Sequence, residues 1–427
     1  MNMTEKMTSR QRVYAALEHK QPDRVPIDFG GNFNSGIAVL GHIRLKRRLG
    51  VESPTYCRDV VPMLACTELD DGMEIMKMMG SDIIEFPAQM WTEWEDGLPT
   101  GHFGEARELK LKDGSTCLVA PMPPIVENAD GSRDMIIGKR PVFRMPKDGF
   151  YFDRIYSPLA HVDTMEKLEE EIPKWKSRFY YTPFPDVYLQ LLKRYAKLAH
   201  EQTDYFVLAN MPAILSIWHS NLEFFGYEKY FMMMAAQPKM VHRWMEFTTE
   251  QNAIRLTQYL DACGEYINGI IIGDDYGNQR TTHMSPAMFR DQVKPYFKRL
   301  CDLIHKKTPH VKVFLHSCGA VKSLIGDFIE AGVDVLNPVQ ISAKDMDPAA
   351  LKSEFGDDIA FWGGGIRAQE TLYRGTVEEC KEEVKRNMEI FMKDGGFVFA
   401  ADHDIQEHVA PEKIIATFQT ALEYGKY

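Results

Sequence analysis

The chain has 427 residues, of which 44% are hydrophobic and 26% are charged, so it is able to fold around a large core. Its 50 basic and 61 acidic side chains leave a net charge of -11, which disfavours nucleic acid and anionic lipid as partners. The chain shows no run of roughly 20 apolar residues and no signal-peptide core, and its seven cysteines are scattered, so we expect a cytoplasmic protein with reduced thiols.

The first predicted element is an outer helix. Thr8 and Gln11 have the spacing of a capping box, and apolar residues follow them at helical spacing. Thereafter short β-rich runs recur, most of them followed by a long helical pattern, and this alternation is typical of βα units. The runs are nearly continuous in apolar residues, as in strands that are covered on both faces. There are eight: 25–29, 82–86, 206–210, 269–273, 312–316, 333–337, 359–363 and 397–401.

Eight strands that alternate with helices predict an α/β fold, a single (β/α)8 TIM barrel over residues 1–427. Two of the later helices have recognisable starts, at Ser285 ahead of residues 288–305 and at Thr376 ahead of a helix that reaches Lys393. Active sites of such barrels lie at the carboxyl ends of the strands. Polar residues that follow each run are therefore the first candidates for function.

Residues 88–155 interrupt the alternation. The turn pairs Asp113-Gly114 and Asp130-Gly131 separate short alternating runs, which predicts an inserted antiparallel β-hairpin unit after the second strand. Because insertions at this point lie over the mouth of a barrel, we expect either a lid or a solvent-facing ornament with its own small core. Trp91, near the start of the insertion, is a candidate substrate-binding residue.

The sharpest candidate site is KVFLHSCG at 312–319. His316 and Cys318 are two residues apart at the end of an apolar run, so both side chains lie on the same side. Imidazole nitrogen and thiolate sulfur are donors that zinc prefers, and the strand end places them at the barrel mouth. The alternative is a packed cysteine beside a capped histidine.

His403, just beyond the eighth run, is the candidate third zinc ligand. Together with His316 and Cys318 it would leave one coordination position open, as in catalytic zinc sites. The carboxylates of Asp402 and Asp404 are candidates to fix its tautomer. A substrate-binding or purely structural histidine is the alternative.

Three further run ends carry candidate residues. Asp274 and Asp275 follow the fourth run and are candidate catalytic residues, although adjacent side chains point to opposite sides, so we expect only one to face the site. Their alternative is a helix cap or an ion pair. Gln340 and Trp362, after the sixth run and at the end of the seventh, are candidate substrate-binding residues, with a core position as the alternative for Trp362.

Taken together, several of these segments resemble the uroporphyrinogen decarboxylase superfamily. The resemblance runs from about residue 8 to the C-terminus, apart from 88–155. Its segments are TSRQRVYAALEHKQPDRVPIDF, GDDYGNQ, SPAMFRDQVKPYFKRL, KVFLHSCGAV, AGVDVLNPVQ, FWGGGI and FVFAADHDIQEHVAPEKI.

That superfamily contains metal-free decarboxylases of the haem pathway and zinc methyltransferases that exchange methyl groups with a corrinoid on a partner protein. The HSCG motif resembles the second branch, that of methylcobamide:coenzyme M methyltransferases, in which a later cysteine completes the zinc site; His403 stands at that position here. The decarboxylases carry an arginine-rich RQAGR motif, where this chain has DFGGNFNSG. Without those arginines, a substrate with many carboxylates lacks its electrostatic anchor.

The resemblance implies a zinc-dependent methyltransferase, with Zn2+ and a partner-borne corrinoid as cofactors. The substrate would be a methoxylated aromatic, a thiol or a similar small molecule, as in anaerobic O-demethylation, and Asp275 would donate a proton or orient it. The alternatives are a metal-free decarboxylase and a non-catalytic barrel that docks a corrinoid protein. The oligomeric state is left open, with a homodimer as one option.

Overall fold

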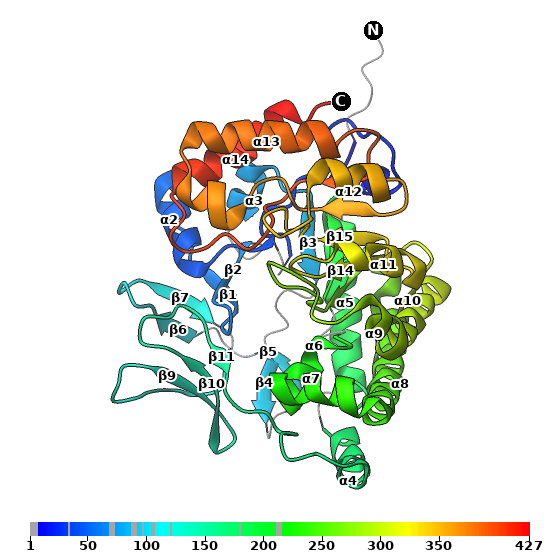
Figure 1. Ribbon diagram of the computed structural model, residues 1–427. Helices are drawn as coiled ribbons and strands as arrows, with labels where there is room; N and C mark the ends of the chain where they lie inside the picture. The colour runs from blue at the N-terminus through cyan, green and yellow to red at the C-terminus, as the bar shows by residue number, and fades with distance from the viewer. Residues whose placement is uncertain are drawn as a thin grey trace.

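A curled sheet of seven parallel strands forms the centre of the protein (Figure 1). The computed structural model describes residues 7–32, 35–67, 73–86, 92–95, 98–103, 107–119, 122–178, 181–210 and 216–427. The strand order is β17-β16-β15-β14-β13-β12-β3. The strands are β3 (Ile83–Phe86), β12 (Phe206–Ala209), β13 (Gly269–Gly273), β14 (Lys312–His316), β15 (Val335–Asn337), β16 (Ala360–Trp362) and β17 (Phe397–Val398). The fold is therefore α/β and resembles a TIM barrel.

The first predicted strand, residues 25–29, is not a strand. This segment instead joins the two edges of the sheet by backbone hydrogen bonds. Asp28 N donates to Phe399 O, next to β17, at 2.8 Å, and Asp82 N, next to β3, donates to Ile27 O at 2.7 Å. The one parallel bridge here joins Ile27 to Phe399. Pro26 has no N–H to donate, which limits the length of a regular ladder. Seven of the eight predicted runs form strands, and the eighth position is taken by this irregular segment.

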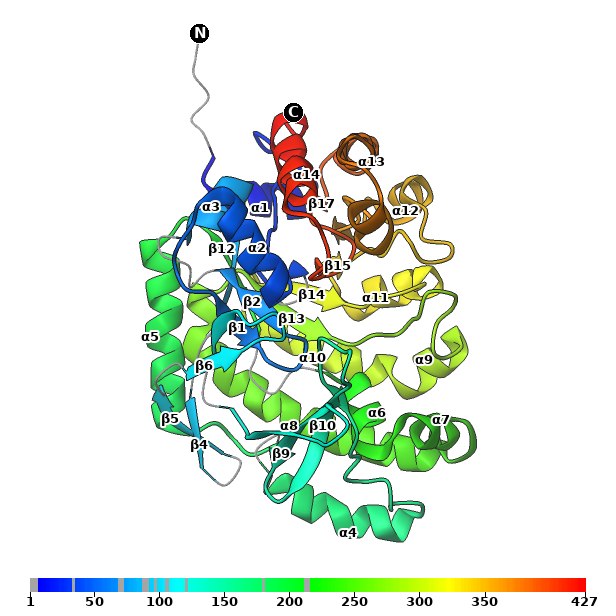
Figure 2. The ribbon, with the colours of Figure 1, turned by 90° about the vertical axis from the view of Figure 1, so that its left-hand side faces the viewer.

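The helices surround the sheet (Figures 1 and 2). Capping boxes begin α1 at Thr8 and α13 at Thr376, as predicted, and Ser285 caps α9. The predicted helix over 288–305 is two helices that part at Val293, because Pro295 cannot donate a helical hydrogen bond. The α-helices are α1 (Ser9–Leu17), α2 (Val39–Leu49), α3 (Glu74–Met79), α4 (Met165–Lys176), α5 (Asp186–Gln202), α6 (His219–Phe225), α7 (Tyr227–Ala236), α8 (Pro238–Cys263), α9 (Pro286–Gln292), α10 (Lys294–Lys307), α11 (Ile325–Ala331), α12 (Pro348–Phe355), α13 (Val377–Phe391) and α14 (Pro411–Tyr424).

The inside of the curled sheet is packed with side chains. Trp362 is fully buried there, with its ring centroid 5.1 Å from that of Phe314 and 6.1 Å from that of Phe206. Its indole Nε1 donates to Asp28 Oδ2 at 2.8 Å, so its polar atom is satisfied within the core. The space inside the curled sheet is thus filled by packed side chains and does not form a pore.

Residues 56–66 and much of the segment 88–155 form small sheets beside the barrel, in which the described strand pairs are antiparallel except for β1 and β7, which are parallel (Figure 2). Because β6 and β7 join β1 and β2, which precede the second predicted strand, this sheet is shared between the segment 88–155 and earlier chain. Whether residues 88–155 act as one inserted unit or as a lid stays a prediction. The strands are β1 (Tyr56–Asp59), β2 (Leu64–Cys66), β4 (Thr92–Glu95), β5 (Leu98–Phe103), β6 (Arg107–Lys110), β7 (Thr116–Val119), β8 (Ile125–Glu127), β9 (Arg133–Ile137), β10 (Arg140–Met145) and β11 (Asp153–Arg154).

Among the described residues, none of the helices combines the length and the apolar character that crossing a membrane requires.

Candidate metal centre

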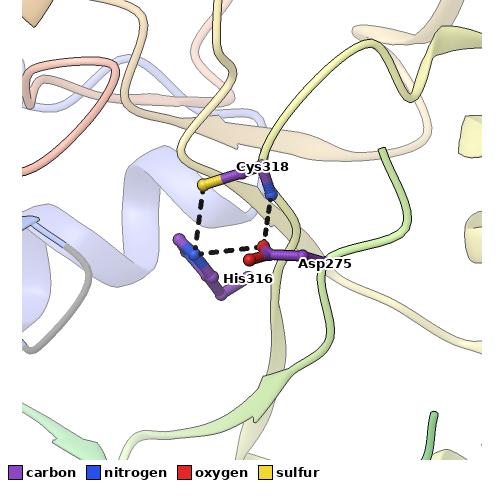
Figure 3. Close-up of side chains that lie close together, drawn as sticks. All are labelled: Asp275, His316 and Cys318. Carbon is purple, nitrogen blue, oxygen red and sulfur yellow. Dashed lines mark hydrogen bonds and ion pairs between the residues drawn. The ribbon is translucent and has the colours of Figure 1, made fainter. Parts of the chain in front are cut away.

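Three side chains converge where β13 and β14 end (Figure 3). His316 Nε2 lies 3.4 Å from Cys318 Sγ and 3.6 Å from Asp275 Oδ1, and the backbone N–H of Cys318 donates to Asp275 Oδ1 at 2.8 Å. One donor atom from each residue lies within 4.8 Å of the other two, and within the described part of the chain this is the one such group of three or more. We call Asp275, His316 and Cys318 the candidate metal cluster.

The loop after β13 and the loop after β14 pack closely enough to bring these residues together. Gly319 has a φ of +89°, and a Cβ there would lie 2.4 Å from the backbone carbon of Gly277. Only glycine meets both requirements without strain. Tyr276 N donates to Ser317 Oγ at 3.0 Å, and Ala320 N donates to Asn278 O at 2.8 Å. These contacts hold Asp275 beside Cys318.

Asn337 orients the His316 ring. It is the register partner of His316 on the next strand, β15, and its Oδ1 lies 2.7 Å from His316 Nδ1. Asn337 Nδ2 donates to Trp362 O at 3.0 Å, which fixes the amide with its oxygen toward the histidine. The Nδ1 of His316 must then carry the proton. The lone pair of Nε2 consequently faces Cys318 and Asp275, as metal coordination requires.

Burial and neighbouring charges oppose each other in their effect on the pKa of Asp275 and reinforce each other in their effect on the pKa of Cys318. Burial acts to raise the pKa of Asp275, but the nearby His316 and His219 rings and the N–H of Cys318 outweigh it, so the pKa is lowered. Burial raises the pKa of the Cys318 thiol well above its usual value, and the carboxylates of Asp275 and Asp404 add to this. The site therefore combines the Asp275 carboxylate with a Cys318 thiol whose negatively charged form is disfavoured by burial and by the neighbouring carboxylates.

Asp274 lies away from the candidate metal cluster. It is 1% exposed, and its oxygens accept hydrogen bonds from Tyr276 Oη at 3.0 Å and from the start of α6. The donors at α6 are the Ser216 hydroxyl and the N–H groups of residues 217, 218 and 219. Of the two adjacent acids, then, only Asp275 faces the site, and Asp274 ties α6 to β13.

His403 is not a member of the candidate metal cluster, although it contributes to the lowered pKa of Asp275. Its Nδ1 is buried without a hydrogen-bond partner among the described residues. The flanking acids bind backbone and hydroxyl groups instead: Asp402 accepts from Ser342 Oγ and Ala368 N, and Asp404 accepts from Gly36 N. The structure thus brings Asp275, and not His403, to His316 and Cys318.

The three predicted substrate-binding residues have different positions. Gln340 is 2% exposed, and its Oε1 accepts from Gly319 N at 2.8 Å, so it supports the loop that carries Cys318. Trp362 lies in the core of the barrel, as described above. Trp91 lies outside the described residues.

Asn337 is a residue of the site that the sequence analysis missed. The signal was present, because residues 312–316 and 333–337 are predicted strands that end with His316 and Asn337. In a parallel sheet, strand ends of neighbouring strands meet at the same edge. A polar residue that closes the next strand is therefore a candidate partner for a metal-binding histidine.

The donor set of the candidate metal cluster fits zinc. It offers one imidazole nitrogen, one sulfur and one carboxylate oxygen, all of which are zinc ligands in proteins. Three protein ligands leave a position for substrate, as in catalytic zinc sites. The hydrogen bond from His316 to Asn337 supplies the outer partner that ligating histidines usually have.

Comparisons with known proteins agree with the sequence resemblance. Residues 217–424 match the family model described as uroporphyrinogen decarboxylase (URO-D). A uroporphyrinogen decarboxylase of Nautilia profundicola is 28% identical over 116 residues, which are 26% of this chain and 32% of that protein. The match thus spans about a third of the length of this curated relative.

A solved structure shares the fold over nearly the whole chain. It is a methyltransferase from Methanosarcina mazei, and the alignment covers 98% of this chain and 99% of that chain at 15% identity, with a TM-score of 0.52. At this identity the likeness concerns the fold alone. The family match thus places the resemblance to uroporphyrinogen decarboxylase in residues 217–424, and the solved structure shows a likeness of fold alone.

Proposed function

We propose that this protein is a zinc-dependent methyltransferase that moves a methyl group between a small substrate and the corrinoid of a partner protein. The observation that carries the proposal is the convergence of Asp275 Oδ1, His316 Nε2 and Cys318 Sγ within 4.8 Å of one another. The substrate is a methoxylated aromatic, a thiol or a similar molecule. The methyltransferase that shares this fold is consistent with the proposal.

Each residue of the site has a role in this proposal. His316, Cys318 and Asp275 hold the metal, and Asn337 keeps the proton of His316 on Nδ1 so that Nε2 is available. Zinc, when bound, supplies Lewis acidity that lowers the pKa of a thiol or draws charge from an ether oxygen. Asp275 also accepts from the N–H of Cys318, which fixes the sulfur relative to the histidine.

A metal-free decarboxylase is the second candidate. The name of the matching family model and the relative from Nautilia profundicola favour it. Under this alternative, Asp275 and His403 bind a carboxylated substrate directly. The two functions differ in one property that is easily measured, since only the methyltransferase depends on a divalent metal.

The test is methyl transfer from a methoxylated aromatic, and from a methyl thioether, to reduced cobalamin, followed by its visible spectrum. We expect transfer by the zinc-loaded protein and its loss in Cys318→Ser. The matched control is Cys301→Ser, because Cys301 is a buried thiol on α10 outside the cluster. Transfer that survives a chelator and Cys318→Ser would contradict the proposal, as would decarboxylation by metal-free protein.

A further inference from the structure

A cavity of about 420 Å³ lies between the barrel and the antiparallel sheets. Its walls come from four parts of the chain: the start of α2 with the β1–β2 turn, residues of β6, β8, β9 and β10 with 150–152, Gln369, and the loop after β17. The volume falls in the range of roughly 300–1,000 Å³ that is typical of small-molecule sites. The role of this cavity is not explained by the metal chemistry proposed above.

Most of the cavity wall is apolar. Leu64 from β2, Leu109 and Leu111 from the β6–β7 hairpin, Met145 from β10 and Phe152 contribute to it. These residues belong to or adjoin two of the small sheets, β2-β1-β7-β6 and β11-β10-β9-β8, so the cavity exists only because these sheets pack beside the barrel. A wall of this kind selects an apolar body and excludes a highly charged one.

The wall formed by the sheets carries cations. Lys112 donates to the carbonyl oxygens of Lys147 and Gly149 and lies 5.4 Å above the Phe150 ring, so its position is fixed. Lys112 and Arg133 both line the cavity, and burial, followed by the charge of Arg133, lowers the pKa of Lys112. The Nε of Arg133 is 3.9 Å from a carboxylate oxygen of Glu127, whose side chain is 68% exposed. An ion pair of this length at the surface offsets little of the arginine charge.

The wall formed by the barrel differs from the wall formed by the sheets in its charge. It carries His403, Asp404 and Glu407. His403 and Asp404 follow β17, and the carboxyl ends of β13, β14 and β17 lie at the same edge of the parallel sheet, so this wall lies at the end of the barrel that carries the candidate metal cluster. Because the barrel wall carries acidic groups and the sheet wall carries cations, a ligand with one negative charge is oriented with that charge toward the sheets.

We propose that this cavity binds the non-reacting part of the substrate, and that the substrate is an apolar ring with a single anionic group that pairs with Arg133. The inference rests on the proposed function, because it names the substrate class of the same site. A ring-sized body fills the apolar wall while the opposite end of the molecule faces His403. Arg133 then selects among substrates, and the candidate metal cluster acts on the selected one.

The test measures binding of three probes that share one body: 4-methoxybenzoate, methoxybenzene and 4-methoxybenzylamine. Titration calorimetry is done on full-length protein, with zinc and after chelation. We expect 4-methoxybenzoate to bind about tenfold or more tightly than methoxybenzene, and the amine to bind most weakly, since a charge-assisted hydrogen bond favours the anion. Arg133→Gln removes the preference for the acid and leaves methoxybenzene within about twofold.

Two further variants complete the test. Lys139→Gln removes the same charge from the β9–β10 turn outside the cavity, and we expect it to leave all affinities unchanged. Leu109→Trp fills the cavity and should abolish binding of every probe while circular dichroism stays that of the wild type. Equal binding of the acid and of methoxybenzene would overturn the inference, as would equal effects of Arg133→Gln and Lys139→Gln.

The binding readout separates this inference from the proposed function. Selective binding by protein that transfers no methyl group even when it is loaded with zinc would support the site and reject the methyltransferase. Methyl transfer that Arg133→Gln leaves unchanged for every probe would support the methyltransferase and reject the site.

Discussion

The Oδ1 atom of Asn337 lies 2.7 Å from the Nδ1 atom of His316, and the two residues are register partners at the ends of neighbouring strands. The second bond of the Asn337 amide, to the Trp362 carbonyl, determines which of its atoms faces the imidazole. This pair therefore decides which nitrogen of His316 is available to a metal, before any metal binds.

Asn337→Ala should weaken zinc binding about 10- to 100-fold, the effect usual for the outer partner of a ligating histidine. Asn337→Asp keeps an oxygen that accepts from Nδ1 and should retain most of the affinity. Competition with a chromophoric chelator measures both values. Equal affinity of wild type and Asn337→Ala would show that the hydrogen bond does not prepare His316 for the metal.

Replacement by asparagine should lower the free energy of unfolding at Asp274 and weaken zinc binding at Asp275. Asp274→Asn places an amide against five donors and should lower the free energy of unfolding by about 1–3 kcal/mol or more. Asp275→Asn should leave the unfolding of metal-free protein nearly unchanged and weaken zinc binding. Denaturant unfolding and metal titration of both variants check this pair. A stability loss in Asp275→Asn larger than that in Asp274→Asn would reverse the assignment.

Gly319→Ala should disrupt the approach of the two loops. A side chain at a φ of +89° costs on the order of 1–3 kcal/mol, and the added Cβ also meets the Gly277 backbone. Both the unfolding free energy and the zinc affinity should fall. Gly326→Ala is the matched control: Gly326 lies within α11 with no atom near its added Cβ, so helix propensity predicts a gain of roughly 0.5–1 kcal/mol.

The stability of the protein should depend on pH through Asp28. Burial raises the pKa of Asp28 to about 7, against hydrogen bonds from Ser35, Trp362 and Gly31 that act to lower it. Because the unfolded value is about 3.9, the folded state holds the proton more tightly. The contribution of Asp28 to stability is thus fully present below about pH 4 and is lost as the pH rises through about 7.

Asp28→Asn removes this titration. As the pH rises from 4 to 7, the free energy of unfolding of the variant should increase relative to that of wild type by up to about 1.4 kcal/mol per pH unit. The variant is expected to be the less stable protein at low pH, since the Asn amide cannot accept from all the donors around Asp28. Stability curves that run parallel over this range would show that Asp28 does not titrate as described.

Much of the fold follows from sequence periodicity. Runs such as GIII and VFL are apolar without alternation, and each lies in a strand that is covered on both faces. Residues 25–29 have the same appearance but form only bridges, because Pro26 cannot donate. Residues 56–66 gave no clear signal, and their pairing with β7 depends on contacts distant in sequence.

The candidate site was predictable in part for similar reasons. His316 and Cys318 share a face because they are two residues apart, which the sequence shows directly. That Asp275 joins them depends on how Gly319 packs on Gly277, a contact between two loops that spacing does not reveal. Trp362 ends a strand, yet its side chain points into the barrel, since the direction of a strand residue depends on register.

We propose that Asp275, His316 and Cys318 bind one zinc ion without His403. X-ray absorption at the zinc edge, combined with metal analysis, tests it most directly in wild type, Cys318→Ser and His403→Ala. We expect about one zinc per chain with a single sulfur neighbour at about 2.3 Å, unchanged in His403→Ala and lost in Cys318→Ser. Protein without zinc, or a sulfur signal that persists in Cys318→Ser, would contradict it.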